Sequence, residues 1–537
     1  MKGDSQMTTF SDRLKEAMYA QNLKQIDLVH IAAENNVKLG KSHVSQYVSG
    51  KTVPRNDILH FLADTLHVDA DWLLGDSQEN FTARENNSVA PKTPSTTKTS
   101  GSVGTSNSSK RGTTPMKKTI TDKNDNDNAG SSAMHIFKKS SKLDNVLYDV
   151  RGPVVEEAAR MEERGTHVLK LNIGNPAPFG FRTPDEVIYD MSQQLSDCEG
   201  YSPSQGLFSA RKAIMQYSQI KKLPNVTIND IYTGNGVSEL INLCMSALLD
   251  NGDEILIPSP DYPLWTACAT LAGGKAVHYI CDEQSDWYPD IEDMRRKITD
   301  RTKALVIINP NNPTGYLYTR REMNQIRDLV KKYDLFLFSD EVYREFIYTG
   351  SPYISACHLE GIENNVVLID SVSKRYSECG IRIGALITKN KEIRDAVMKF
   401  CQARLSPPLI GQIAAEASLD APEEYSRETY DEYVERRKCL IDGLNRIPGV
   451  YSPIPMGAFY TVAKLPVDDS DKFCAWCLSD FEYEGQTVFM APASGFYTTP
   501  GSGINEVRIA YVLKKEDLTR ALFVLQKALE AYPGRTE

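Results

Sequence analysis

The chain has 537 residues, too many for one ordinary domain, so we expect two or three. Hydrophobic residues make up 41% and charged residues 25%, and the net charge is −10, which is typical of a soluble globular protein. No apolar run approaches the ~18 residues of a membrane helix, and no apolar signal core opens the chain. We therefore expect a cytoplasmic protein without membrane contact.

Residues 1–76 are predicted to form a compact helical domain. Phe10, Leu14 and Met18 keep helical spacing, and a second helix begins at Gln25. A turn leads from there to a polar helix over residues 41–51. Two helices joined by a turn, the second rich in hydrogen-bonding groups, suit reading of the DNA major groove. The segment resembles the helix-turn-helix of the Cro and phage-repressor family, which implies DNA contacts by Ser42, His43, Ser45, Gln46 and Lys51.

The charge of this domain leaves an alternative open. Residues 1–76 contain eight Lys and Arg against ten Asp and Glu, a net charge of −2. Non-specific DNA binding needs several cations that neutralise phosphates. A local patch of Lys41, Lys51 and Arg55 would meet that need. The alternative is a helical interaction or dimerisation module that does not bind DNA.

Residues 77–133 are predicted to be a disordered linker. Ser, Thr, Asn, Gly and Lys dominate the segment, and apolar residues are nearly absent, so it cannot bury a core. Such a linker lets the folded parts on either side move separately.

Residues 134–537 alternate apolar runs with helical patterns, which predicts an α/β fold with a mostly parallel sheet covered by helices on both faces. We expect a large domain over about 186–395 and a small domain built from the flanking segments. Asn312, Asp340 and Tyr343 directly follow two predicted strands. Because ligands of doubly wound sheets bind beyond the carboxyl ends of strands, these residues are expected to line a binding site.

Lys374 follows another buried strand. Burying a charged amine at such a position costs free energy unless the amine is paired or has reacted. Ser371 and Ser373 precede it and Arg382 follows it. Hydroxyls and a guanidinium together suit a phosphate group. The combination predicts a Schiff base between Lys374 and pyridoxal phosphate. Within such a site, an aspartate can pair with the pyridinium nitrogen, and tyrosine and asparagine can donate to the phenolic oxygen.

The motifs Asn311-Asn312-Pro-Thr-Gly315, Asp340-Glu-Val-Tyr343 and Ser371-Val-Ser-Lys374 with Arg382 resemble the aspartate-aminotransferase family. That family is fold type I of the pyridoxal-phosphate enzymes, class I and II. The resemblance runs from about residue 137 to the end, and its front part looks most like bacterial alanine aminotransferases. It implies a transaminase that forms a homodimer with shared active sites.

Further cofactor contacts follow from the resemblance. A glycine-rich turn opens a helix at Gly236, Val237 and Ser238, and a helix amino terminus favours a phosphate. Tyr262 is expected to stack on the pyridine ring. Tyr201 is expected to reach the cofactor phosphate of the neighbouring subunit.

The resemblance also implies how the substrate is held. The Gly174 backbone approaches it, and Arg508 and Asn312 bind its carboxylate. The amino acid displaces Lys374 from the cofactor, and the freed Lys374 then moves the Cα proton. The product is an oxoacid, and the second half-reaction runs backward with another one.

The choice of substrate stays open between alanine and aspartate as donors paired with 2-oxoglutarate and glutamate. Were Arg404 to meet a side-chain carboxylate, aspartate or glutamate would be favoured. Two other functions remain as alternatives. One is a transcription regulator that senses pyridoxal phosphate, and the other is a carbon–sulfur lyase on the same fold. The ten cysteines are scattered, which favours reduced thiols, and we interpret Cys474 and Cys477 as helical core residues.

Overall fold

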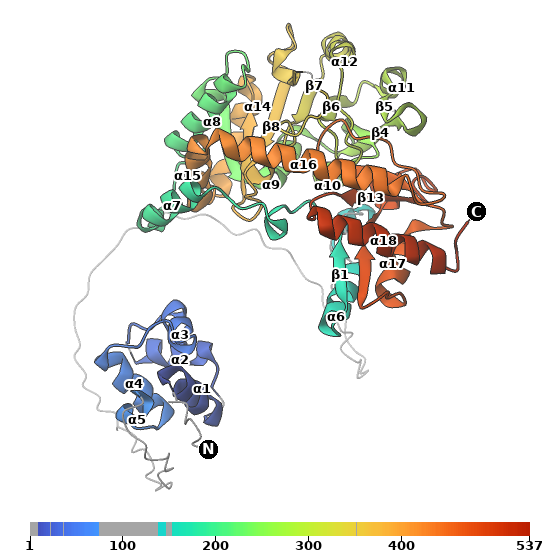
Figure 1. The fold of residues 1–537 in the computed structure, drawn as a ribbon. Helices are drawn as coiled ribbons and strands as arrows, with labels where there is room; N and C mark the ends of the chain where they lie inside the picture. The colour runs from blue at the N-terminus through green and yellow to red at the C-terminus, as the bar shows by residue number, and fades with distance from the viewer. Residues whose placement is uncertain are drawn as a thin grey trace, which may run out of the picture. The chain divides into compact units, whose positions relative to one another are not determined.

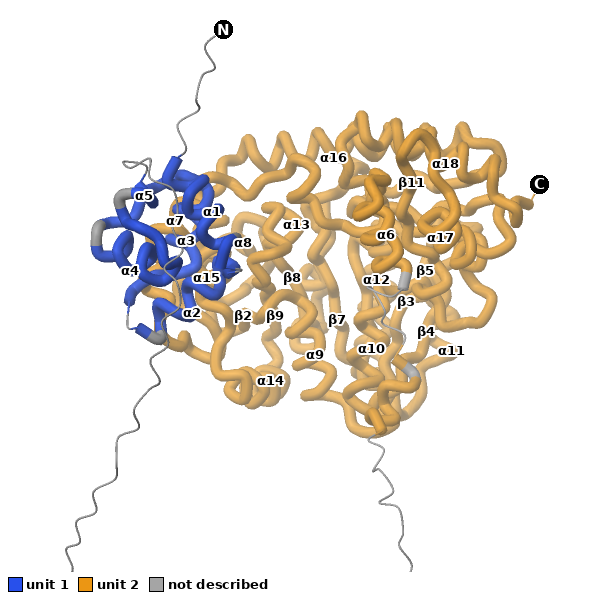
Figure 2. The backbone as a smooth tube through the Cα atoms, turned by 90° about the horizontal axis from the view of Figure 1, so that it is seen from below, with its two compact units in different colours: residues 1–128 blue, residues 129–537 orange. Residues whose placement is uncertain are grey.

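The computed structural model describes residues 9–21, 23–35, 37–74, 138–146, 153–350 and 352–536. The chain divides into two compact units, residues 1–128 and 129–537 (Figure 2). The predicted linker, residues 77–133, lies outside the described residues. No helix among those described is long and apolar enough to cross a bilayer.

The first unit is all-helical. Its core is a cluster of apolar side chains that includes the fully buried Leu14, Leu28, Leu62, Leu66 and Leu73. Helical spacing of these residues gives each helix one apolar face, and the faces pack on one another. The helices are α1 (Phe10–Ala20), α2 (Gln25–Glu34), α3 (Lys41–Val48), α4 (Asn56–Leu66) and α5 (Ala70–Leu74).

The second unit is organised around an eight-stranded sheet (Figure 1). Its inner strands are parallel, whereas β9 runs antiparallel between β2 and β8, and β5 runs antiparallel at the other edge. In spatial order the strands are β2 (Ile231–Asn235), β9 (Ile383–Ile387), β8 (Val366–Ser371), β7 (Phe336–Asp340), β6 (Thr302–Ile308), β3 (Glu254–Ser259), β4 (Lys275–Asp282) and β5 (Tyr288–Pro289).

Both faces of this sheet are buried, because successive side chains of a strand point to opposite sides. In β6, Ala304, Val306 and Ile308 belong to one apolar cluster, whereas Leu305 and Ile307 belong to another. The first cluster includes residues of α9 (Gly236–Leu248), α10 (Leu264–Leu271) and α14 (Lys391–Ala403). The second includes residues of α11 (Ile291–Lys297) and α12 (Arg320–Tyr333). The predicted fold, a mostly parallel sheet between helical layers, is confirmed.

The segments on either side of the large sheet in sequence form smaller sheets. Strand β1 (His167–Lys170) pairs in parallel with β11 (Gln486–Phe489), and β13 (Glu506–Ala510) lies between β10 (Tyr460–Lys464) and β12 (Ala491–Pro492). The long helix α16 packs on α18 (Figure 1). The helices of this part are α6 (Pro153–Glu163), α16 (Glu423–Leu444), α17 (Ser470–Ser479) and α18 (Lys515–Ala531).

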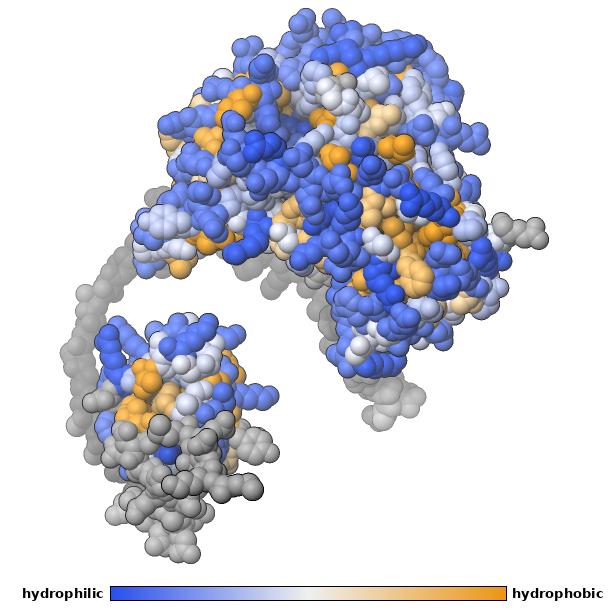
Figure 3. All heavy atoms as spheres, viewed as in Figure 1, coloured by the Kyte–Doolittle hydropathy of each residue, from blue (hydrophilic) through white to orange (hydrophobic). Residues whose placement is uncertain are grey.

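Three further helices lie near the β2 edge, and α15 contacts both of the others. They are α7 (Asp185–Gln193), α8 (Phe208–Ile220) and α15 (Leu409–Ala417). On the face seen in Figure 3, hydrophilic residues dominate and apolar residues form scattered patches.

Candidate active site

The strand order brings the Lys374 turn next to the start of α9. Gly234 of β2 pairs with Gly384 of β9, and Gly384 pairs with Ser371 of β8. Strand β2 leads into α9, and β8 leads into the short helix α13 (Val372–Arg375), which carries Lys374. Segments more than 130 residues apart in the chain therefore meet at one edge of the sheet.

Lys374 is half-buried, and its amine points toward the loop after β1. The Nζ atom donates to the Gly174 carbonyl at 2.7 Å and lies 3.4 Å from the Cys379 sulfur. A Cβ atom on Gly174 would fall 1.9 Å from the Tyr460 hydroxyl, so only glycine lets this backbone come so close. The amine thus lies beside the backbone that was predicted to approach the substrate.

Arg382 and the first turn of α9 form a cationic cradle. The guanidinium lies over Gly236, where a Cβ would fall 2.2 Å from its Nη2 atom and where φ is +73°. The hydroxyl oxygens of Ser371 and Ser373, in the neighbouring turn that carries Lys374, lie 2.8 Å apart. Val237 and Ser238 follow Gly236 in the same turn. Free backbone amides, a guanidinium and hydroxyls are the donors that a phosphate requires, so these residues fit the phosphate of pyridoxal phosphate.

Asp340 ends β7 and is 5% exposed. It accepts hydrogen bonds from the Trp265 indole at 3.4 Å and from the Val342 amide at 3.3 Å. Neither donor is charged, and burial raises the pKa of Asp340 from 3.8 to about 6. A buried carboxylate without a cationic partner among its described contacts fits a ligand that brings a positive N–H group, such as a pyridinium.

Tyr343 and Tyr262 belong to loops at the carboxyl ends of β7 and β3. The Tyr343 hydroxyl lies 3.1 Å from that of Tyr460, and burial raises the pKa of Tyr343 well above its ordinary value. It therefore remains a neutral donor at physiological pH. Tyr262 is half-buried and lies close enough to Tyr343 to contribute to that shift of the pKa.

Arg508 and Asn312 meet although 196 residues separate them. The Arg508 Nη1 atom donates to the Asn312 side-chain oxygen at 3.3 Å, and Nη2 donates to the Asn172 carbonyl at 2.5 Å. The rings of Tyr460 and Phe496 each lie 4.8 Å from the guanidinium carbon. The guanidinium is thus fixed in orientation, as a group that grips a carboxylate must be.

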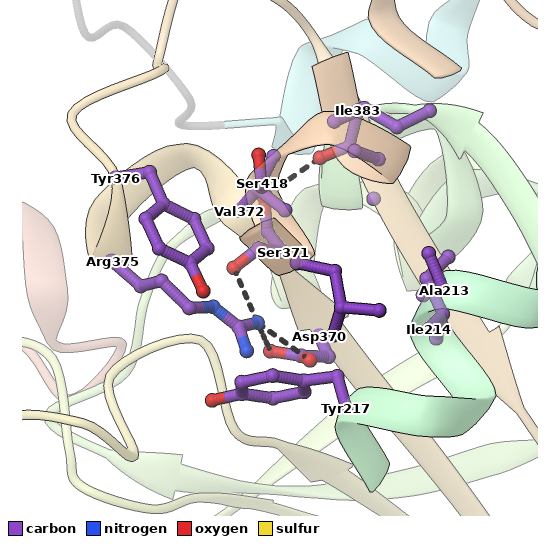
Figure 4. A pocket seen from close by; sticks show the side chains of 14 residues that line it. Ala213, Ile214, Tyr217, Asp370, Ser371, Val372, Arg375, Tyr376, Ile383 and Ser418 are labelled. Carbon is purple, nitrogen blue, oxygen red and sulfur yellow. Dashed lines mark hydrogen bonds and ion pairs between the residues drawn. The ribbon is translucent and has the colours of Figure 1, made fainter. Parts of the chain in front are cut away.

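An ion cluster beneath the Lys374 turn was missed by the sequence reasoning (Figure 4). Arg375 donates to both Asp370 oxygens, at 2.7 and 2.8 Å, and Arg344 forms a second ion pair with Asp370. The Tyr217 ring lies 3.9 Å from the Arg375 guanidinium carbon. Burial alone would raise the pKa of Asp370, but Arg344 and Arg375 bring it below its ordinary value.

Tyr201 and Arg404 were also singled out from the sequence. Tyr201 is 82% exposed. Arg404 forms an ion pair with Glu239 and donates to the Thr233 and Ser204 carbonyls. A guanidinium engaged in this way is not free for a substrate carboxylate, so the reading of Arg404 as a substrate contact loses its basis.

In the first unit, the residues predicted to face DNA share one property, which is that each is exposed on or just after α3. Val44, within the same helix, is 1% exposed and packs into the core. The exposed residues are Ser42, His43, Ser45, Gln46 and Lys51.

The model of the family "Aminotransferase class I and II" matches residues 166–525. The glutamate-pyruvate aminotransferase AlaA of Haemophilus influenzae is 43% identical over 343 residues, which cover 62% of this chain and 84% of that protein. An alanine aminotransferase of Mycobacterium bovis is 40% identical over 420 residues, covering 75% and 95%. An aspartate aminotransferase of Pyrococcus horikoshii is 29% identical over 380 residues, covering 70% and 93%.

Solved structures agree with the sequence comparisons. An aminotransferase from Escherichia coli has a TM-score of 0.68 at 39% identity, covering 74% of this chain and 99% of its own. An alanine aminotransferase from Pyrococcus furiosus also has a TM-score of 0.68, at 34% identity, covering 74% and 100%. This chain therefore belongs to the class I and II aminotransferases, the pyridoxal-phosphate-dependent transaminases of fold type I.

Proposed function

We propose that this aminotransferase exchanges the amino group between glutamate and pyruvate. The glutamate-pyruvate aminotransferase of Haemophilus influenzae and the alanine aminotransferase of Mycobacterium bovis share 43% and 40% identity with it, against 29% for the aspartate aminotransferase of Pyrococcus horikoshii. Arg404, the one residue that favoured a dicarboxylic donor, is engaged with Glu239. The convergence of Arg508, Asn312 and the Lys374–Gly174 pair around one site supports the transaminase chemistry, and the higher identity to the two proteins named for alanine or pyruvate carries the choice of pyruvate.

In the proposed site, Arg508 binds the carboxylate common to all these substrates. Each of its two terminal nitrogens carries two N–H groups and uses one of them, for Asn312 or for Asn172, so one N–H group on each nitrogen remains for a carboxylate oxygen. The flanking Tyr460 and Phe496 rings exclude water from the pair and prevent rotation of the guanidinium. Because the Asn312 oxygen accepts from Arg508, the asparagine amide nitrogen is free to donate toward the ligand.

Lys374 is proposed to move the proton at the substrate Cα. Bound pyridoxal phosphate supplies an aldehyde that links to amines and a ring that accepts an electron pair. The Gly174 carbonyl orients the Lys374 amine, and positioned base groups of this kind typically contribute ~10²–10⁴-fold to the rate. Asp340 holds a proton at the ring nitrogen, which its buried charge favours.

Assays of glutamate with pyruvate and of glutamate with oxaloacetate test the substrate proposal, which requires the first pair to react faster. Faster reaction with oxaloacetate overturns it, and pyruvate release from cystathionine without an acceptor would indicate a carbon–sulfur lyase. Borohydride reduction followed by peptide mapping should find the pyridoxyl group on Lys374. Lys374→Ala should abolish both label and turnover, whereas Lys391→Ala, at an exposed lysine on α14, should change neither.

The homodimer with shared sites is also a proposal. Tyr201 and Phe208 are 82% and 64% exposed, which is costly for large rings that stay in water. Mixing inactive Lys374→Ala protomers with Tyr201→Ala protomers tests it. If Tyr201 serves the partner's site, each hybrid dimer regains one intact site, up to about a quarter of the parent activity. If the mixture is never more active than the average of the two variant homodimers, Tyr201 acts within its own subunit.

For the first unit we propose DNA binding through a helix-turn-helix formed by α2 and α3. The support is the set of exposed polar residues of α3 on either side of the buried Val44. Fluorescence anisotropy with a mixed-sequence DNA duplex should show affinity that falls with salt, and Lys51→Ala should lower the salt slope by about one. Lys15→Ala, a charge-matched change at an exposed residue of α1 and outside the α2–α3 motif, serves as the control. No binding at low salt would favour the protein-interaction module, and binding that depends on cofactor without turnover would favour the regulator.

A further inference from the structure

Arg404 connects the strand and the helix that flank the predicted phosphate turn. It follows the last residue of α14, and its side chain is 13% exposed. One terminal nitrogen pairs with Glu239, and the other donates to the Thr233 carbonyl at 2.7 Å and the Ser204 carbonyl at 3.2 Å. Thr233 belongs to β2 and Glu239 to the first turn of α9. A single guanidinium therefore spans both sides of the turn.

Glu239 places a negative charge in the helical turn that was assigned to a phosphate. Its carboxylate accepts a hydrogen bond from the Asn235 amide at 2.7 Å, one residue before Gly236. The same turn carries the free amides of Gly236, Val237 and Ser238. An anion in this position weakens the binding of a second anion unless a cation compensates its charge.

We propose that Arg404 is a positioning residue for the cofactor phosphate. It neutralises Glu239 and holds the turn against β2, while Arg382 is the cation that faces the phosphate directly. This inference rests on the proposed function, which assigns the Gly236 turn to the phosphate. Arg404 thus acts on cofactor binding through Glu239 and has no contact with the substrate.

The surrounding loops are held by bonds that do not depend on the Arg404 charge. The Gln412 side-chain oxygen accepts from the Leu207 amide at 2.6 Å and from the Thr233 hydroxyl at 3.0 Å. The Ser204 hydroxyl donates to the Leu405 carbonyl at 2.5 Å. Replacing Arg404 by glutamine removes the charge and keeps a side-chain donor. The local fold should therefore survive the change.

The test compares two ligands that differ only in the phosphate, pyridoxal phosphate and pyridoxal. Dissociation constants are measured by fluorescence titration of the full-length apoprotein for the parent, Arg404→Gln, Glu239→Gln and the double variant. Arg404→Gln should bind pyridoxal phosphate about tenfold to a hundredfold more weakly, and pyridoxal within about threefold of the parent. Glu239→Gln should bind pyridoxal phosphate no more than about threefold more weakly than the parent, because the glutamine side chain still accepts the hydrogen bond from the Asn235 amide. The double variant should recover to within about fivefold of the parent.

If Arg404→Gln weakened the binding of pyridoxal phosphate and of pyridoxal equally, the proposal would be overturned. It would also be overturned if the double variant bound pyridoxal phosphate as weakly as Arg404→Gln does. Should Arg404→Gln fail to fold by circular dichroism, Arg404→Lys decides, since it retains the charge and should keep most of the preference for the phosphorylated ligand. Loss of that preference in a folded lysine variant would contradict the charge argument. A parent protein that lacks the preference would overturn the phosphate assignment of the turn itself, and with it the proposed function of those residues.

Discussion

Replacing Asp340 by asparagine should make the cofactor-free protein relatively more stable as the pH rises. The hydrogen-bond donors to Asp340, the Trp265 indole and the Val342 amide, are uncharged, and burial raises its pKa from 3.8 to about 6. The folded protein therefore keeps this proton at pH values where the unfolded chain has released it. Ionisation thus opposes folding progressively between pH 4 and 6, by about 3 kcal/mol once complete, since one pH unit corresponds to about 1.4 kcal/mol.

Asparagine resembles the protonated acid and does not titrate. The free energy of unfolding of Asp340→Asn, minus that of the parent, should therefore grow by about 1.4 kcal/mol between pH 5 and pH 7 and then stay level. A constant offset of about 1–2 kcal/mol is allowed if one donor loses its acceptor. Urea unfolding of the apoproteins at pH 5, 6, 7 and 8 measures the growth. Asp395→Asn is the control, because a hydrogen bond from Lys391 lowers the pKa of that exposed acid, away from this window.

Binding of the cofactor should reverse the order of stability of the parent and Asp340→Asn. Pyridoxal phosphate stabilises the parent through a charged partner for Asp340, so Asp340→Asn should show a smaller rise in Tm on cofactor addition and a large loss of turnover. A stability difference that does not change with pH would refute the reasoning about burial. Normal turnover by the variant would refute the pairing with the ring nitrogen.

Three further outcomes are expected. Arg508→Lys should raise KM for glutamate and for alanine about 30- to 100-fold, because an ammonium cannot bind a carboxylate bidentately; an unchanged KM would contradict the assignment. Gly236→Ala should lower Tm and weaken pyridoxal phosphate binding at least about tenfold, since its Cβ would meet Arg382 at 2.2 Å in a left-handed backbone; a titration equal to the parent's would oppose this. Asp370→Asn should cost about 3–5 kcal/mol in urea unfolding by leaving buried guanidinium groups unpaired, and a loss below about 1 kcal/mol would contradict that.

The sequence predicts the fold and much of the site because both depend on local patterns. The apolar runs around residues 304–308 and 335–339 are too short for helices and lead directly into polar motifs, so Asp340 could be placed at a strand end. The sheet then brings such ends together whatever their separation in the chain. The fold, the transaminase activity and the cofactor are confirmed; the roles of individual residues, the domain boundaries and the cytoplasmic location stay predictions.

Contacts between distant segments could not be predicted in the same way. Arg404 was considered as a substrate contact because residues 400–408 depart from the pattern of the alanine aminotransferases. Its partners, Ser204, Thr233 and Glu239, lie more than 160 residues earlier, and no local pattern links them to it. Side-chain contacts of this kind depend on the packed structure.

Asp340 and Asp370 show how one sheet holds two buried carboxylates in different electrostatic environments. They lie near the ends of neighbouring strands, where Asp340 pairs with Ile369 in register, and both are nearly fully buried. Two guanidinium groups, those of Arg344 and Arg375, lower the pKa of Asp370, and it remains ionised without any ligand. Asp340 receives no such partner among the described residues, and its pKa is raised. The unfavourable burial of an ionised Asp340 would therefore be relieved by a cationic ligand, which is the role that we propose for the protonated ring of the cofactor.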